Sequence, residues 1–559
     1  MTQTLPDLAL GQPRFQNAAL QAIADAQGPI EAWRTAVAKG RTAAIATAAE
    51  TQGHFAVALG LPSGRCFMAT DRFAAHSICF TEGAQGLRFA ERADELGEGR
   101  TEIDPQAIYD YLYFHMIPSP RTVWRGVRRL PPGHFVWHEG GETEVGNYWT
   151  PRFKAPGTAQ FAPLAEEFRP LLRRSVARAL DGSKPACFLS GGTDSSTVAG
   201  LIGEVAGRPA ASYSIGFDAA GYDEMAFARI AARRFGTEHH EYYVTPDDLV
   251  RAIPLAATHL DQPFGNSSAL PAYYCALEAK KDGVSRLLAG DGGDELFGGN
   301  ARYAKQRVFG WYQQVPGALR RGLLEPALSP RATASVPLVK KARSYVEQAR
   351  VPLPARSEMY NLLLRLGPQQ ILTPGFLARV ETQEPLHQQQ AVWDAADAPD
   401  ELNRTLAFDW RYTLAENDLA KVRYSTSMAG VEVAYPLLDD ELLSFSLRLP
   451  VDYKLRGLNL RWFFKEALRG FLPDEIIAKK KHGFGLPFGV WATRHEALRR
   501  LATDSLQGAV HRGLVQARFV DELLSTHLPA HPGYYGEMVW ILMMLEQWLR
   551  QHAPDTRLG

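Results

Sequence analysis

Two glycine-rich turns carry the side chains of this sequence best suited to hold a polyphosphate. The first reads Ser-Gly-Gly-Thr-Asp-Ser-Ser over residues 190–196, between a short apolar stretch, 186–189, and a segment expected to be helical, 195–205. Backbone N–H groups at a helix N-terminus bind anions, and adjacent glycines let the main chain approach phosphate oxygens closely. A plain tight turn is the alternative, but the pattern predicts a phosphate loop made of Ser190, Gly191, Gly192, Ser195 and Ser196.

The second turn, Gly-Asp-Gly-Gly-Asp over residues 290–294, again follows an apolar stretch, 286–289. A carboxylate beside a polyphosphate is repelled unless Mg²⁺ bridges the two, so Asp194 in the first turn is predicted to bind this metal. In an open parallel sheet the carboxyl ends of neighbouring strands line one crevice, so Asp291 and Asp294 are expected to face Asp194. A solvated glycine-rich loop is the alternative for this second turn.

A basic segment, Lys-Lys-Lys-His-Gly-Phe-Gly-Leu-Pro over residues 479–487, could supply the opposite charge. A run of lysines is often a solvated face. Beside a reacting phosphoanhydride, one such lysine would instead neutralise charge that develops on the adenylate, the leaving pyrophosphate or a tetrahedral intermediate.

Bulk composition narrows the class of protein. Among 559 residues, 46% are hydrophobic and 22% charged, as in soluble globular proteins. Lys plus Arg equals Asp plus Glu at 61 each, so no net field attracts nucleic acid or an anionic membrane. We find no targeting segment and no membrane-length apolar run, and expect a cytoplasmic protein. The four cysteines are scattered and are expected to be small buried residues, neither zinc ligands nor disulfide partners.

The order of expected elements indicates an α/β fold. Residues 1–150 contain period-two apolar runs separated by turns, which predicts an antiparallel β-rich domain. Residues 151–160 resemble a linker, and 316–354 look loop-rich. Further on, expected helices (163–180, 195–205, 224–235) alternate with expected strands (186–189, 211–217, 286–289), which predicts a doubly wound parallel sheet. No Walker GxxxxGK[ST] motif and no GxGxxG after a strand is found, so neither of those nucleotide sites is favoured.

SGGTDSS at 190–196, GDGGDELFGG at 290–299 and KKKHGFGLP at 479–487 together resemble the asparagine synthetase family. The likeness spans most of 160–500 and includes SYSIGF at 212–217, GTEHHE at 236–241, DQPFGNSS at 261–268 and VEVAYPLLD at 431–439. It implies a PP-loop ATP pyrophosphatase fold, of the adenine nucleotide α-hydrolase type, that binds ATP and Mg²⁺. By this resemblance Leu189, Ile215 and Gly290 border the adenosine, Asp194 and Asp294 hold Mg²⁺, Lys481 is the active-site lysine, and Asp291 helps bind or deprotonate an amine.

Residues 1–150 resemble the family's glutaminase half, an N-terminal-nucleophile-type domain, over about 50–150, and residues 160–559 its synthetase half. A working glutaminase of this type needs cysteine as residue 2, where this sequence has Thr2, and we find no MCGIxG, RGPD or NGEIYN equivalent before residue 50. We therefore expect a degenerate domain that serves as a scaffold.

The resemblance implies an AMP- and pyrophosphate-forming ligase that adenylates a carboxylate and captures it with an amine or ammonia. Where asparagine-forming members read ExRxPFLD and VDRxSMA, this sequence has EVAYPLLD and VRYSTSM, with Ala434 in place of an arginine that would grip a carboxylate. Both changes are expected to lie near the acceptor pocket, and they point away from ordinary asparagine synthesis. Loss of the glutaminase favours a lactam-forming substrate, as in β-lactam synthetase and lasso peptide macrolactam synthetase relatives, over aspartate with ammonia, because an amine in the same molecule needs no ammonia source. A peptide substrate would bring peptide-processing partners. A PP-loop RNA-modifying enzyme and an inactive scaffold are the alternatives from other classes.

Glutamine should not support product formation above a control without any nitrogen donor, because the thiol and the glutamine-holding segments of the glutaminase are missing. The measurement is glutamate release alongside product formation. Glutamate released in step with product would contradict the degenerate assignment.

Overall fold

The computed structural model describes residues 7–61, 64–83, 86–97, 102–154, 159–320, 322, 337–479 and 485–559. No helix within these ranges is long and apolar enough to span a membrane.

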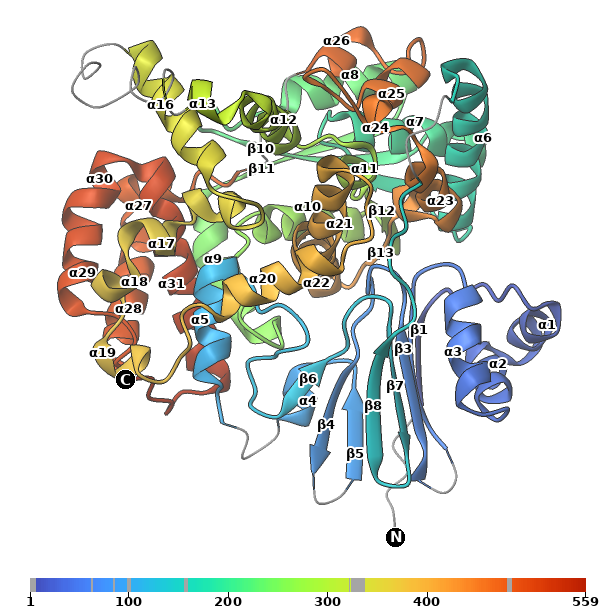
Figure 1. The fold of residues 1–559 in the computed structure, drawn as a ribbon, viewed down its shortest axis with the longest axis horizontal. Coiled ribbons are helices and arrows are strands. Elements are labelled where there is room, and N and C mark those ends of the chain that lie inside the picture. The colour runs from blue at the N-terminus through green and yellow to red at the C-terminus, as the bar shows by residue number, and fades with distance from the viewer. Residues whose placement is uncertain are drawn as a thin grey trace.

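The N-terminal part folds around two antiparallel sheets, drawn at the bottom of Figure 1. The larger sheet has the order β1-β2-β3-β7-β8, with bounds Leu8–Gly11, Phe55–Gly60, Cys66–Thr70, His134–Glu139 and Glu142–Asn147. The smaller has the order β5-β4-β6, with bounds Gly86–Ala90, Cys79–Gly83 and Val127–Arg129. The antiparallel prediction is confirmed. It missed three short helices that pack beside the larger sheet, α1 (Ala18–Gln27), α2 (Pro29–Val37) and α3 (Arg41–Glu50).

The remainder of the chain folds around a five-stranded parallel sheet, as the alternating pattern predicted. Its order is β11-β10-β9-β12-β13, with bounds Glu238–Val244, Ala211–Phe217, Ala186–Phe188, Arg286–Leu288 and Glu432–Ala434. The predicted helices appear as α6 (Phe161–Ala179), α7 (Thr193–Ala206) and α8 (Met225–Phe235). On the other side of the sheet lie α9 (Pro246–His259), α10 (Ala269–Lys281) and α22 (Leu419–Met428).

Strand alternation explains why helices cover both faces. Successive side chains of a strand point to opposite faces, so a strand buried on both faces must be apolar throughout. Ala186 and Leu287 belong to the core that contains α9, α10 and the C-terminal helices, whereas their neighbours Cys187 and Leu288 belong to the core under α6, α7 and α8. All four cysteines are buried and free.

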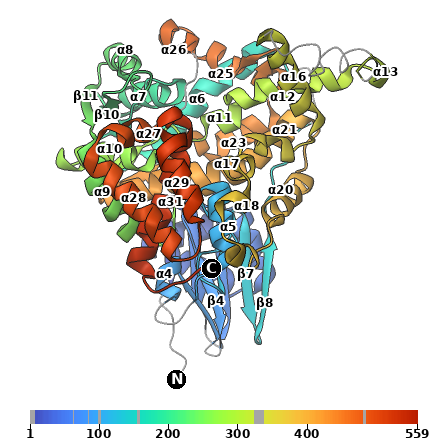
Figure 2. The same cartoon turned by 90° about the vertical axis from the view of Figure 1, so that its left-hand side faces the viewer.

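The prediction of a loop-rich segment over 316–354 is wrong in part, because α16 spans Pro337–Arg350. The prolines of the segment concealed a run of good helix formers such as Lys, Arg, Glu and Gln. The C-terminal bundle consists mainly of α27 (Phe488–Arg494), α28 (Glu496–His511), α29 (Ala517–Glu522) and α31 (Pro532–His552), and it faces the viewer in Figure 2.

Candidate active site

A cavity of about 1210 Å³ opens at the carboxyl ends of β9, β10 and β12. A cavity at this edge is where open α/β sheets bind ligands. Its size exceeds the roughly 300–1,000 Å³ of common single-ligand pockets, which leaves room for a nucleotide and a second substrate. The three residues expected beside the adenosine, Leu189, Ile215 and Gly290, all line it.

The predicted phosphate loop lies on the wall of this cavity. Ser190, Gly192, Asp194 and Ser195 line it, and the Ser190 N–H donates to Ser195 Oγ at 3.1 Å. Gly191 and Ser196 are outside the lining. Gly191 has φ +67°, and a Cβ there would lie 2.3 Å from the backbone of Phe227, so its glycine lets the loop pack against α8.

Asp194 and Asp294, predicted to bind a metal, lie close enough to share one guanidinium. Arg461 Nη1 donates to Asp194 Oδ1 at 2.6 Å, and Arg461 Nη2 donates to both carboxylates. The arginine side chain is only 5% exposed. In the structure the two acidic turns therefore approach each other across the sheet edge, as predicted, and an arginine lies between them.

Glycines surround this acid pair because side chains would displace it. A Cβ at Gly299 would lie 1.8 Å from Arg461 Nε and from Asp294 Oδ1, and one at Gly293 would lie 2.3 Å from Asp194 Oδ1. Gly292, with φ +96°, would meet Leu438 at 2.1 Å. The second glycine-rich turn is thus a packing requirement of the site.

A second charged group lies on the wall formed by α22. Lys421 Nζ donates to Asp418 Oδ1 at 3.0 Å and lies 3.8 Å from Asp291 Oδ1. Burial raises the pKa of Asp291 to about 6 and that of Glu295 to about 8. Burial would lower the pKa of Lys421, but Asp418 and Asp291 raise it instead, so the ammonium form is held. At neutral pH Asp291 is therefore mostly ionised beside a cation, and Glu295 mostly protonated.

One lysine of the basic segment is described. Lys479 Nζ donates to Glu224 Oε2 at 3.1 Å, lies over the Phe227 ring and lines the cavity. Lys481 lies outside the described residues, as does Thr2.

The sequence reasoning missed Arg461, Lys421 and Asp418. Arg461 follows the β14–β15 hairpin, Leu455–Arg456 and Asn459–Leu460, and begins α25 (Trp462–Ala467) in a left-handed conformation with φ +54°. No short motif marks such a position. Lys421 and Asp418 could have been suspected, because they immediately precede the altered VRYSTSM stretch.

Of the two altered stretches, VRYSTSM contributes a residue to the cavity lining and EVAYPLLD does not. Ala434 lies in β13 opposite Leu288, packs against the core under α6 and α7, and does not line the cavity, whereas Val422 does.

The fold and the site together define an α/β ATP-dependent ligase. The asparagine synthase family model matches residues 167–550, and the glutamine amidotransferase domain model matches 38–149. The chain belongs to the asparagine synthase family, whose members are carbon–nitrogen ligases that form AMP and pyrophosphate. This membership favours a ligase over an RNA-modifying enzyme.

Similar proteins carry names from the same family. An asparagine synthetase (glutamine-hydrolysing) of Bacillus subtilis is 25% identical over 86% of this chain and 74% of its own length. A putative enzyme of the same description from Mycobacterium bovis is 27% identical over 89% and 76%. A third, from Methanocaldococcus jannaschii, is 31% identical over 40% of this chain and 43% of its own.

Gly299→Ala should lower the affinity for MgATP at least about tenfold, which is about 1.4 kcal/mol, because the added methyl group must push Arg461 and Asp294 apart. Titration calorimetry measures this affinity. Gly310→Ala is the matched control: its Cβ meets open space within α12 (Ala301–Gln314), and alanine should stabilise that helix by about 0.5–1 kcal/mol. Equal MgATP affinity in both variants would show that the acid pair does not take part in nucleotide binding.

Proposed function

We propose that this chain adenylates a carboxylate in the cavity and then transfers the acyl group to an amine. The observation that carries the proposal is the separation of two charged groups in one cavity. Asp194, Asp294 and Arg461 lie together beside the phosphate loop. Lys421 of α22 pairs with Asp418, just before that helix, and lies 3.8 Å from Asp291 of the second glycine-rich turn. One group suits a polyphosphate and the other an amine.

The charge balance of the cavity supports a divalent cation. Among the described residues, seven carboxylates and four cationic side chains line it: Asp194, Glu224, Asp291, Asp294, Glu295, Asp418 and Glu466 against Lys421, Arg461, Lys465 and Lys479. A polyphosphate would be repelled by this surplus. Mg²⁺ is commonly bound by one or two carboxylates together with substrate phosphates, and Asp194 and Asp294 already converge on one cation. These two residues would hold the metal, which when bound neutralises phosphate charge.

In the first half-reaction a substrate carboxylate oxygen attacks the α-phosphorus of ATP, and pyrophosphate leaves. The loop at Ser190, Gly192 and Ser195 lies where it can bind the phosphates through N–H and hydroxyl donors. Arg461, released from the two carboxylates, can donate to the departing pyrophosphate. Lys481 would neutralise charge in either half-reaction.

In the second half-reaction the neutral amine nitrogen attacks the acyl carbon, AMP leaves, and one proton is removed from nitrogen; an amine that arrives as an ammonium ion must first lose another proton to solvent. Asp291 is the base that we assign to this step. Its pKa of about 6 keeps it ionised at neutral pH yet basic enough to accept a proton. Lys421 holds this carboxylate from one side, and the surplus of carboxylates favours an acceptor that arrives as an ammonium ion.

The degenerate N-terminal domain favours a lactam-forming substrate, because an amine in the same molecule as the carboxylate needs no ammonia source. Asparagine formation from aspartate and free ammonia is the second candidate.

Pyrophosphate release distinguishes the two candidates. The protein is incubated with MgATP and either L-aspartate with and without ammonium chloride, or a panel of amino carboxylates without ammonium. Release of pyrophosphate and a cyclic amide without ammonium supports the lactam assignment. Asparagine formed only with ammonium supports the second candidate, and no pyrophosphate from any carboxylate would argue against the proposed chemistry as a whole.

Asp194→Asn and Asp294→Asn should each lower pyrophosphate formation by on the order of 10²-fold or more while the protein stays folded, since each removes a charge that would hold the metal. Asp247→Asn, on an exposed side chain of α9, is the control and should keep full activity. Raising the Mg²⁺ concentration should partly restore the two site variants and leave the control unchanged. Wild-type turnover in Asp194→Asn or Asp294→Asn would remove the assigned metal role.

Lys481→Met should keep ATP binding and lose amide product, with a barrier increase of roughly 3–4 kcal/mol, or 10²–10³ in rate, by analogy with one lost oxyanion donor. Labelled pyrophosphate exchange into ATP is measured beside product. Exchange kept with product lost places the lysine in the second half-reaction, and loss of both places it in the first. Lys281→Met, a surface lysine paired with Glu278, is the control. Normal rates of both reactions in Lys481→Met would show a solvated lysine.

A further inference from the structure

A buried ion cluster joins the N-terminal part to the wall that carries Asp418. Glu416 lies in the π-helix Trp410–Asp418, directly before α22. Arg129, from β6, donates to Glu416 Oε2 at 2.5 Å, and the Ser119 hydroxyl donates to Oε1 at 2.6 Å. The side chains of Arg129 and Glu416 are only 9% and 5% exposed. Arg411, one turn earlier, also pairs with Glu416 and donates to the Ser119 carbonyl oxygen at 2.5 Å.

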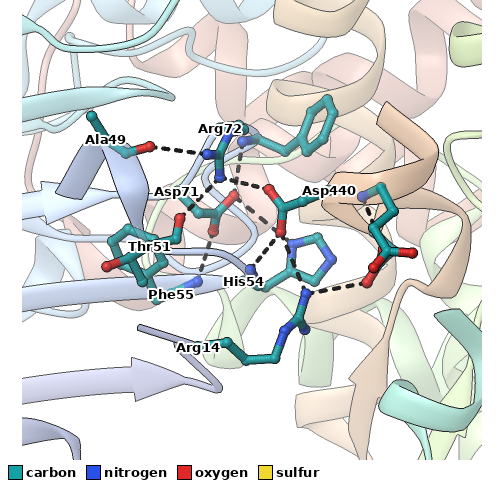
Figure 3. A network of polar contacts seen from close by, with 12 residues as sticks. Arg14, Ala49, Thr51, His54, Phe55, Asp71, Arg72 and Asp440 are labelled. Carbon is teal, nitrogen blue, oxygen red and sulfur yellow. Dashed lines mark hydrogen bonds and ion pairs between the residues drawn. The ribbon is translucent and has the colours of Figure 1, made fainter. Parts of the chain in front are cut away.

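A second cluster joins the two parts beyond the other end of α22, and it is drawn in Figure 3. Asp440, at the start of α23 (Asp440–Arg448), accepts from Arg72 Nη1 and from the backbone N–H of Gly53, each at 2.6 Å. Arg14 donates to the adjacent Asp439 at 3.2 Å. His54 lies within this cluster, with Nδ1 3.9 Å from Asp71 Oδ1 and its ring against that of Tyr435 at 5.9 Å between centroids.

Both clusters act on the same short stretch of chain. The Tyr435 hydroxyl donates to the backbone oxygen of Leu419 at 3.2 Å, and Arg423 donates to the backbone oxygen of Ala75 at 3.4 Å. The stretch 410–440 is therefore bonded to the N-terminal part before, within and after α22. Its other face lines the cavity through Thr413, Asp418, Lys421 and Val422.

We propose that the N-terminal domain holds the α22 wall of the cavity in place. Arg129 and Ser119 act through Glu416 as positioning residues for Asp418 and Lys421. The inference rests on the proposed function, and it gives a domain expected to lack glutaminase chemistry a part in the second half-reaction. The phosphate loop has no such bond to Glu416, so the two half-reactions depend on this cluster unequally. Loss of the cluster should move Lys421 from its carboxylate partners and leave nucleotide binding intact.

The test measures the side-chain environment of Lys421 without any substrate. Wild type, Arg129→Met, Arg129→Lys and Ser119→Ala are treated briefly with acetic anhydride, and acetylation of Lys421 is read by peptide mass spectrometry relative to the surface residue Lys281. Arg41→Met is the matched control, because Arg41 forms an exposed ion pair with Glu144 in the same domain. MgATP affinity is measured for every variant.

We expect acetylation of Lys421 to rise about tenfold in Arg129→Met, the change in free amine that follows from one pKa unit of lost carboxylate interaction. Arg129→Lys should restore part of the protection, and Ser119→Ala should give a smaller rise. MgATP affinity should stay within about twofold, as for distant independent sites. Arg41→Met should match wild type in both measurements.

Unchanged Lys421 acetylation in folded Arg129→Met overturns the inference, as does an equal rise in Arg41→Met. If Arg129→Met does not fold, Ser119→Ala decides, because it removes one hydroxyl and leaves the ion pair: acetylation equal to that of wild type then overturns the inference. Failure of the proposed function is read separately, as absence of pyrophosphate release by wild type, and it leaves the acetylation result interpretable.

Discussion

Two carboxylates converge on one point of the sheet edge, and the backbone around them is shaped by that convergence. Asp194 and Asp294 follow neighbouring strands, and parallel topology brings their side chains together whether or not a cation is present. A bare pair of carboxylates at this distance would repel, so Arg461 neutralises both. The glycines at 293 and 299 exist because nothing larger than hydrogen fits beside these ion pairs. The ion pairs at this site therefore determine both the local backbone path and the choice of glycine at these positions.

The whole chain has no net charge, but its charged side chains are unevenly distributed. Among the described residues that line the cavity, carboxylates outnumber cations, and Arg461, which balances the sheet edge, comes from an element distant in sequence. Arg129 reaches Glu416 across 287 positions, and Arg72 reaches Asp440 across 368. Breaking such a buried pair lowers the stability of the fold, because the charge that remains has neither a partner nor water around it. The N-terminal part is therefore tied to the active site by electrostatics as well as by packing.

Much of this architecture could be predicted because it is local. Apolar runs and glycines within a few residues predict the strand at 211–217 and the turns at 190–196 and 290–294. Arg461 could not be predicted, since its role depends on a hairpin that returns to the sheet edge more than 160 residues after Asp294. Helix α16 was missed because the prolines on either side of it indicated a loop.

The π-helix at 410–418 has a consequence for how this protein could change over time. One extra residue per turn lets Glu416 face the N-terminal part while Thr413 and Asp418 face the cavity. Removing a single residue there would rotate everything downstream by about 100° and separate the two orientations. We therefore expect insertions and deletions in this segment to be selected against. Splitting the gene between its two halves should be selected against too, because the separated synthetase half would expose Glu416 to solvent without the arginine from β6. Whatever reaction the N-terminal domain itself performs, its arginines also complete buried ion pairs of the synthetase half.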